Sequence, residues 1–351
     1  MKFRTTRLFL ATSLLPSLLL TTLLGLSAPG AGQESPALSL ESQIPLPNVK
    51  GRIDHMEVDV KGERLFAAGL ENGTLEVVDL QAGKWMRSIP GFKKPQGALY
   101  VAELNKLFVA SGDDGMLRVF RGDTLELVDP IQLEPGPNRV VYEPHSKLVC
   151  VGYGGKDAGK DYGEVGIIDA KNDKHIGDFK VVAHPSELLL DKSGTTLFVS
   201  VSIANQIQVI DINKRQVVST WRVSSQHPGD AAFDESTSRL FIGTRTPPEM
   251  IVMGSKSGKE VAHLPTADGM DGVYFDAPRK RVYVSGGREL PSGFVYVYQQ
   301  TDADNYEIVG KVVTRGGAGT SLWSPALNRY YVATPANGGA DAAILVYAPG
   351  D

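Results

Sequence analysis

The chain has 351 residues, with 36 Lys and Arg against 40 Asp and Glu, so its formal net charge at pH 7 is −4. Residues 1–31 hold three basic residues and no acidic one, so the remainder has 33 basic against 40 acidic residues and a net charge of −7. This balance argues against a globally basic nucleic-acid surface. The single cysteine, Cys150, excludes an intramolecular disulfide bond.

The first segment has the pattern of an export signal. Lys2, Arg4 and Arg7 precede an apolar run over 8–26, and the small residues of 27–31 follow it. This pattern predicts a secretory signal peptide that is cleaved after Ala31, and therefore a periplasmic or secreted protein. An uncleaved membrane anchor is the alternative, because the run is nearly long enough to span a bilayer. We favour cleavage because Pro16 interrupts the run, and we expect no membrane association afterwards.

The rest of the chain repeats one unit, which is clearest over 184–223. Four short β-type runs lie there, ELLLD, TLFVSV, QIQVIDI and QVVSTWRV, and turn residues separate them. Runs of four to eight residues rich in Val, Ile, Leu and Phe predict a four-stranded antiparallel meander. About forty residues of this pattern, repeated, are typical of a propeller blade.

Seven copies of the unit can be aligned on the end of their first strand. The copies are 42 to 48 residues apart, and their anchors are Asp59, Val101, Glu143, Asp191, Asp234, Asp276 and Ser324. The second runs keep one pattern, as in RLFAAG, KLFVAS, KLVCVG and RYYVAT. We therefore predict an all-β, seven-bladed β-propeller of four-stranded antiparallel blades, in one domain over 32–351. Cys150, inside KLVCVG, is predicted to be a buried, inert strand residue.

The seventh copy ends after the run AILVYAP and lacks a fourth strand. Residues 38–47, LSLESQIPLP, have fourth-strand character but belong to no copy. We predict that this segment pairs onto the last blade and closes the ring, since closure removes exposed strand edges.

The repeat resembles the YVTN propeller repeat. The segment from Gly51 to His55 that leads into RLFAAG, followed by NGTLEVVDLQAGK, is similar to exported bacterial YncE-like proteins. The resemblance covers the whole chain after the signal segment. It implies an exported β-propeller, and it assigns no chemistry because function resides in sites that differ within one fold.

A ligand site is expected at one end of the central channel, where the innermost strands begin. The loops from fourth to first strands and from second to third strands share this face, which we call the top face, and such loops usually carry function. The candidate ligand-binding residues have charges of both signs: His55, Arg139, Glu187, Asp230, Asp271, Arg245 and Arg288. His184 and His227 also lie at strand starts, where capping of loops is the structural alternative. The Gly154–Gly163 loop is interpreted as a mobile rim loop, because it lacks phosphate-loop spacing.

The first residues of the inner strands differ between copies, as a site for one asymmetric ligand would require. We expect Arg139 and Glu187 to face the channel and to behave as surface groups, so that replacing either changes stability by no more than about 1 kcal/mol.

We predict a binding or interaction module, with a small molecule or a protein as partner, and a monomer. A lactonase-type or lyase-type enzyme that uses the polar channel mouth is the alternative, with no catalytic residue identified. No cofactor is predicted, although a divalent cation stays open with Glu187, Asp230 and Asp271 as weak ligands. GxSxG and CxxCH are absent from the sequence, which argues against serine catalysis and attached haem, and nucleic acid is an unlikely partner.

Overall fold

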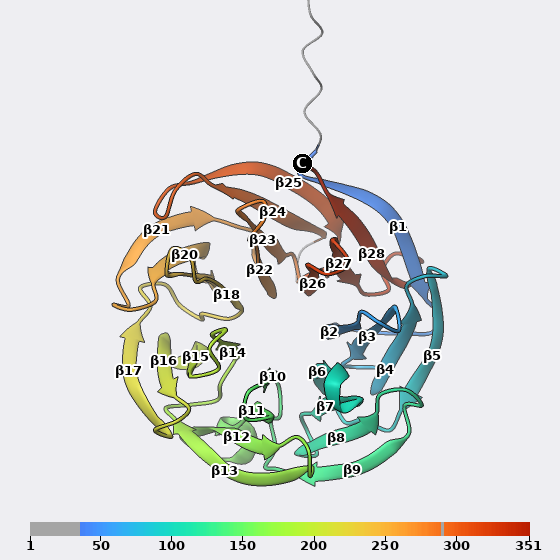
Figure 1. Ribbon diagram of the computed structural model, residues 1–351. Helices are drawn as coiled ribbons and strands as arrows, with labels where there is room; N and C mark the ends of the chain where they lie inside the picture. The colour runs from blue at the N-terminus through green and yellow to red at the C-terminus, as the bar shows by residue number, and fades with distance from the viewer. Residues whose placement is uncertain (1–35, 289–290) are drawn as a thin grey trace, which may run out of the picture. The chain divides into compact units, whose positions relative to one another are not determined.

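The computed structural model describes residues 36–288 and 291–351 and consists of seven four-stranded antiparallel sheets arranged in a ring (Figure 1). The predicted signal segment lies outside the described residues. In the described part of the chain, no helix is both long and apolar enough to cross a membrane.

The first four blades follow the chain in order. Blade one holds β2 (Ile53–Asp59), β3 (Arg64–Gly69), β4 (Thr74–Asp79) and β5 (Lys84–Pro90). Blade two holds β6 (Pro95–Val101), β7 (Lys106–Ser111), β8 (Met116–Arg121) and β9 (Leu127–Gln132). Blade three holds β10 (Val140–Glu143), β11 (Leu148–Gly154), β12 (Gly163–Asp169) and β13 (Lys174–Val181). Blade four holds β14 (Glu187–Leu190), β15 (Thr196–Val201), β16 (Gln206–Asp211) and β17 (Gln216–Arg222).

The last three blades complete the ring. Blade five holds β18 (Ala231–Asp234), β19 (Arg239–Arg245), β20 (Pro248–Gly254) and β21 (Glu260–Pro265). Blade six holds β22 (Gly272–Asp276), β23 (Arg281–Gly286), β24 (Ser292–Gln300) and β25 (Tyr306–Arg315). Blade seven holds β26 (Ser321–Ser324), β27 (Arg329–Thr334), β28 (Ala342–Pro349) and β1 (Leu38–Leu46). Within the described residues, three short 3₁₀ helices lie in loops: η1 (Ala102–Leu104), η2 (Gly155–Ala158) and η3 (Ser202–Ala204).

The seven-bladed fold and its closure are confirmed. β1 pairs antiparallel with β28, with Leu46 opposite Ala342 and Leu38 opposite Pro349, so the first strand of the chain completes the last blade. Six of the seven predicted anchors are the last residues of the inner strands; the exception is Asp191, which follows the end of β14 at Leu190.

The apolar side chains of each blade are buried against the next blade. Seven hydrophobic clusters are found in the described chain, and each one joins two adjacent blades. Ile44 and Leu46 of β1, for example, pack with Ile53, Met56 and Leu65 of blade one. Because each blade depends on both neighbours for burial, the ring holds seven inner strands in fixed positions around one channel (Figure 1).

Candidate functional site

The inner strands β2, β6, β10, β14, β18, β22 and β26 bring the candidate residues to the channel. Close packing between neighbouring blades requires glycine at two positions of these strands. A Cβ on Gly97 would lie 2.1 Å from the Asn138 carbonyl oxygen, and one on Gly272 would lie 2.2 Å from Ser321 Oγ. The absence of a side chain at these two strand starts therefore follows from contact with the next blade, not from selection by a ligand.

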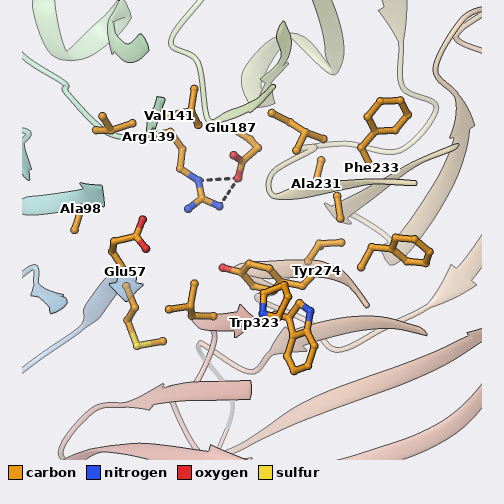
Figure 2. Close-up of a pocket in the computed structure, with 17 residues that line it drawn as sticks. Glu57, Ala98, Arg139, Val141, Glu187, Ala231, Phe233, Tyr274 and Trp323 are labelled. Atoms are coloured by element: carbon orange, nitrogen blue, oxygen red, sulfur yellow. Dashed lines mark hydrogen bonds and ion pairs between the residues drawn. The ribbon is translucent and has the colours of Figure 1, made fainter. Parts of the chain in front are cut away.

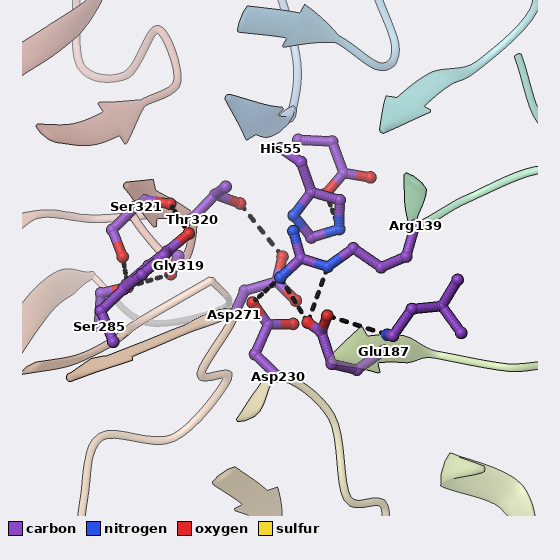
Figure 3. Close-up of polar contacts among 12 residues, drawn as sticks. His55, Arg139, Glu187, Asp230, Asp271, Ser285, Gly319, Thr320 and Ser321 are labelled. Carbon is purple, nitrogen blue, oxygen red and sulfur yellow. Dashed lines mark hydrogen bonds and ion pairs between the residues drawn. The ribbon is translucent and has the colours of Figure 1, made fainter. Parts of the chain in front are cut away.

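Arg139 is the centre of a first ion-pair network (Figure 3). Its Nε donates to Glu187 Oε2 at 2.7 Å, and its Nη2 contacts the same oxygen and donates to Asp230 Oδ2 at 2.9 Å. The side chains of Glu187 and Asp230 are each only 5% exposed, and that of Arg139 is 17% exposed. One guanidinium group thus joins the inner strands of blades three, four and five.

Asp271 is the centre of a second network. Arg52 Nη2 donates to Asp271 Oδ2 at 2.8 Å and to Asp54 Oδ1 at 2.7 Å. Arg245 Nη2 donates to Asp271 Oδ1 at 3.3 Å, and Arg288 Nη2 forms an ion pair with the same oxygen. The Thr320 hydroxyl also donates to Asp271 Oδ2, at 3.1 Å. Three guanidinium groups therefore converge on one buried carboxylate.

The charges of the two networks shift the pKa values of their members. Burial acts to raise the pKa of Asp271, but Arg52 and Arg288 outweigh it and hold this pKa well below its usual range. Burial raises the pKa of Asp54 to about 6, against the opposing charge of Arg52. Burial, together with the charge of Arg139, lowers the pKa of His55 well below its usual value, so His55 is neutral at pH 7. Burial also raises the pKa of Glu187 to about 8, and the Arg139 charge opposes this.

The second network lines a polar pocket of about 190 Å³, which we call the mouth pocket. Its lining includes Arg52, Asp54, His55, Gln96, Asn138, Ser186, Ser202, Gly229, Asp230, Arg245, Asp271 and Arg288. Apart from Arg288 Nη2, which has only its ion pair with Asp271, six buried polar atoms of these residues have no hydrogen-bond partner in the described structure: the Nε atoms of Arg52, Arg245 and Arg288, Asp54 Oδ2, His55 Nδ1 and Asn138 Oδ1. Buried polar groups are almost always paired with protein, water or ligand, so these six atoms mark the place where a ligand or ordered water is expected.

A larger, mixed cavity of about 370 Å³ lies along the inner strands beyond the first network; we call it the inner cavity. Arg139 and Glu187 line it together with apolar residues and one further acid, Glu57 (Figure 2). Asp230, the other partner of Arg139, lines the mouth pocket. The first network therefore lies between the two spaces.

The structure brings all seven candidate residues into these two networks or the pocket they line. It separates His184 and His227 from them: the His184 ring donates from Nδ1 to the Gly154 carbonyl at 3.0 Å, and the His227 backbone N–H donates to Asn205 Oδ1 at 2.9 Å. For these two histidines the loop-capping alternative is the better interpretation.

The expectation that Arg139 and Glu187 behave as surface groups is wrong. Both side chains are largely buried and are bound to each other and to Asp230. The sequence pattern placed them correctly at strand starts, but it did not show that positions 48 and 91 residues apart would meet across the channel.

Several functional candidates were missed from the sequence. Arg52 and Asp54 flank the start of β2, in the same segment as His55. The only signal in the sequence that could have identified them is the alternation of side-chain direction along a strand. Glu57 lies deeper in β2, where its neighbours indicated an ordinary strand residue.

The weak metal candidates are bound by arginine. Glu187 and Asp230 share Arg139, and Asp271 faces Arg52, Arg245 and Arg288. Within residues 36–288 and 291–351, no group of three or more His, Cys, Asp and Glu side chains is arranged to hold a metal ion. The residues present here do not fit a divalent cation.

Comparison with known proteins supports the fold. No family model matches the sequence, and no curated protein matches it. Among solved structures, the Kuenenia stuttgartiensis hydrazine synthase is similar with a TM-score of 0.71 and 17% sequence identity, over 82% of this chain and 94% of that chain. At this identity the likeness shows a shared propeller fold and carries no activity over.

Proposed function

We propose that this protein is an exported binding module that holds a small anionic ligand in the mouth pocket. The observation that carries the proposal is the crowding of Arg52, Arg245 and Arg288 around Asp271, with a buried Nε atom on each arginine left without a partner. The lining holds three arginines and three aspartates, so its formal charges balance, and burial is the main cause that lowers the pKa of Arg245, with the Arg288 charge adding to it. What favours an anion is the set of free N–H groups, which an anionic acceptor would pair.

The remaining unpaired atoms narrow the ligand class. Asp54 Oδ2 and Asn138 Oδ1 are acceptors and need donors from the ligand. A carboxylate with hydroxyl groups offers both acceptors and donors. The 190 Å³ volume admits a ligand of a few heavy atoms or one end of a longer one, because a water molecule takes about 30 Å³ in the liquid. We therefore propose a small hydroxy acid.

The lactonase-type or lyase-type alternative rests on two groups of the mouth pocket. General acid–base chemistry needs a carboxyl or imidazole group free to exchange a proton with a substrate. Asp271, Glu187 and Asp230 are bound to arginines. Asp54 Oδ2 and His55 Nδ1, in contrast, have no partner within the described residues, and burial raises the pKa of Asp54 to about 6. We favour the binding module because three arginines of the same pocket each have an Nε–H group without a partner in the part of the chain that the structure describes.

Calorimetry and thermal shift with lactate, tartrate and gluconate test the proposal, with glycerol and glucose as neutral controls. We expect a hydroxy acid to bind and to raise the melting temperature, with affinity that falls as salt rises. Arg245→Gln should weaken binding, whereas Arg222→Gln, which removes an exposed charge at the end of β17, should not. Binding of the neutral compounds alone, or equal effects of the two substitutions, would contradict the proposal.

The export of the protein is part of this proposal, and the basic, apolar and small-residue succession of 1–31 supports it. The resemblance of the seven repeats to YVTN, YncE-like propellers supports the same location. Protein from its native host should begin near residue 32 and be found in the periplasm or medium. We also propose a monomer, because ring closure pairs the ends of the chain within one molecule; light scattering at several concentrations tests it.

A further inference from the structure

The inner cavity differs in chemistry from the mouth pocket. Its walls are largely apolar and aromatic, and they come from the middle and far ends of the inner strands: Met56, Ala98, Val141, Leu189, Phe233, Tyr274, Phe275, Leu322 and Trp323. Its volume of about 370 Å³ falls in the range of sites for small organic molecules. Glu57, Leu322, Trp323 and Pro325 also line an adjoining hollow of about 210 Å³, so the space continues toward the far end of the channel.

Among the described residues that line this cavity, Glu57 and Glu187 carry the carboxyl groups. Figure 2 shows the Glu57 carboxylate directed into the cavity, on the side opposite Tyr274. Its Oε1 accepts the Val58 backbone N–H at 2.7 Å, and it makes no ion pair within the described residues. Arg139, the cation that lines the same cavity, is already bound to Glu187 and Asp230. Glu57 is half-buried, and a carboxyl group that is partly withdrawn from water without a cation is costly when ionised.

A second unpaired group lies in the same wall. The indole Nε1 of Trp323 is buried and has no hydrogen-bond partner in the described structure. Tyr O–H and Trp N–H groups normally find a hydrogen-bond partner when they are buried. The Tyr274 hydroxyl, in contrast, donates to the Ser321 carbonyl at 2.8 Å.

We propose that the inner cavity is a second binding site, which takes an organic ammonium ion with an apolar or aromatic body. Glu57 supplies the counter-charge, and the faces of Tyr274 and Trp323 suit a cation and an aromatic ring. The Trp323 N–H is a donor, so its partner is an acceptor on the ligand body or a water molecule, not the ammonium group. The site is spatially separate from the proposed anion site, because Arg139, Glu187 and Asp230 lie between the two spaces.

Proton release should accompany binding at this site. Burial raises the pKa of Glu57 to about 7, with only weak opposition from its backbone hydrogen bonds and Arg139. The other titratable or charged groups of the cavity are Arg139, Glu187 and Tyr274. An ammonium ion favours the ionised carboxylate, so it must displace the proton that Glu57 holds below about pH 7.

Calorimetry with phenethylamine, at pH 6, pH 7 and pH 8 and in buffers of different ionisation heat, tests the inference. The uncharged phenethyl alcohol and the anionic hydrocinnamate are matched controls of similar size. We expect the amine to bind, about tenfold more weakly at pH 6 than at pH 8, with about one proton released at pH 6. The alcohol and the acid should bind much more weakly or not at all.

Glu57→Gln should weaken amine binding about tenfold or more and remove the change in affinity between pH 6 and pH 7; the ionisation of Glu187, whose pKa is about 8, remains in this variant. Glu307→Gln, an exposed acid on β25, is the matched control and should leave both unchanged. Circular dichroism establishes that each variant is folded, and Trp323→Phe gives a second variant in the same wall, which should weaken amine binding. No amine binding, equal binding of amine and alcohol, or full retention of pH-dependent binding in Glu57→Gln would each overturn the inference.

Discussion

Arg139 donates a hydrogen bond of 2.9 Å to Asp230, which lies 91 residues later in the chain. Arg139 precedes β10 of blade three and Asp230 precedes β18 of blade five, with Glu187 of blade four bound to the same guanidinium group. Three inner strands are therefore joined at one point of the channel by buried charges. Arg139 can thus stabilise the ring of blades as well as line a ligand site.

Arg139→Ala should lower the free energy of unfolding by about 3–5 kcal/mol above pH 8, where Glu187 is ionised, because it leaves two buried carboxylates without their cation. Denaturant unfolding followed by circular dichroism measures this loss. Arg222→Ala, at an exposed position, should change stability by no more than about 0.5 kcal/mol. A loss below about 1 kcal/mol for Arg139→Ala would mean that water, not buried protein, surrounds this network.

The fold could be read from the sequence because each blade repeats the same local pattern. Alternating apolar runs and turn residues fix strand boundaries one blade at a time, as the agreement at Asp59, Val101 and Glu143 shows. The closing strand was equally accessible, since residues 38–47 had strand character and one blade lacked a strand.

The site was accessible only in part. The starts of inner strands can be located from the repeat, so His55 and Asp271 could be placed at the channel. Which of these groups meet depends on the ring diameter and on side-chain reach between blades, which no local pattern records. That is why Arg139 was expected to make no ion pair. It is also why Glu57, two residues after His55 in β2, was missed.

Substitutions in β1 should show whether this strand is packed between blades seven and one or only lies on the surface. Ile44 is 2% exposed and packs between blades seven and one, whereas Leu40, in the same strand, is 56% exposed. Ile44→Ala should cost about 2–5 kcal/mol of stability, and Leu40→Ala should cost less than about 0.5 kcal/mol. Denaturant unfolding of the two variants measures the difference.

Deletion of residues 38–47 should expose the edge of β28 and cause aggregation. A deletion variant that melts like the intact protein would contradict closure.

Cys150 should be unreactive in the folded protein. Its side chain is buried between blades three and four, and burial raises the pKa of its thiol to about 12. Because the thiolate is the reactive form, an aromatic disulfide reagent should label Cys150 only after unfolding. Rapid labelling of the native protein at pH 8, followed by absorbance, would show instead that the blade opens locally.

Glu57 should make stability depend on pH in a direction opposite to acid denaturation. Burial raises the pKa of Glu57 from 4.5 to about 7, so the folded state holds this proton more tightly than the unfolded state does. The contribution of Glu57 to stability is therefore greatest below about pH 4.5, falls as pH rises toward 7, and is constant above that. A shift of this size corresponds to about 3 kcal/mol over the window.

Glu57→Gln cannot ionise, so its stability relative to the unsubstituted protein should rise by up to this amount between pH 4.5 and pH 8. Denaturant unfolding of both proteins at several pH values measures the difference and cancels the other titrating groups, and Glu307→Gln should show no such trend. Parallel curves for Glu57→Gln and the unsubstituted protein would mean that Glu57 is ionised and solvated in the channel, and the cavity would then lack the unbalanced carboxyl group on which cation binding depends.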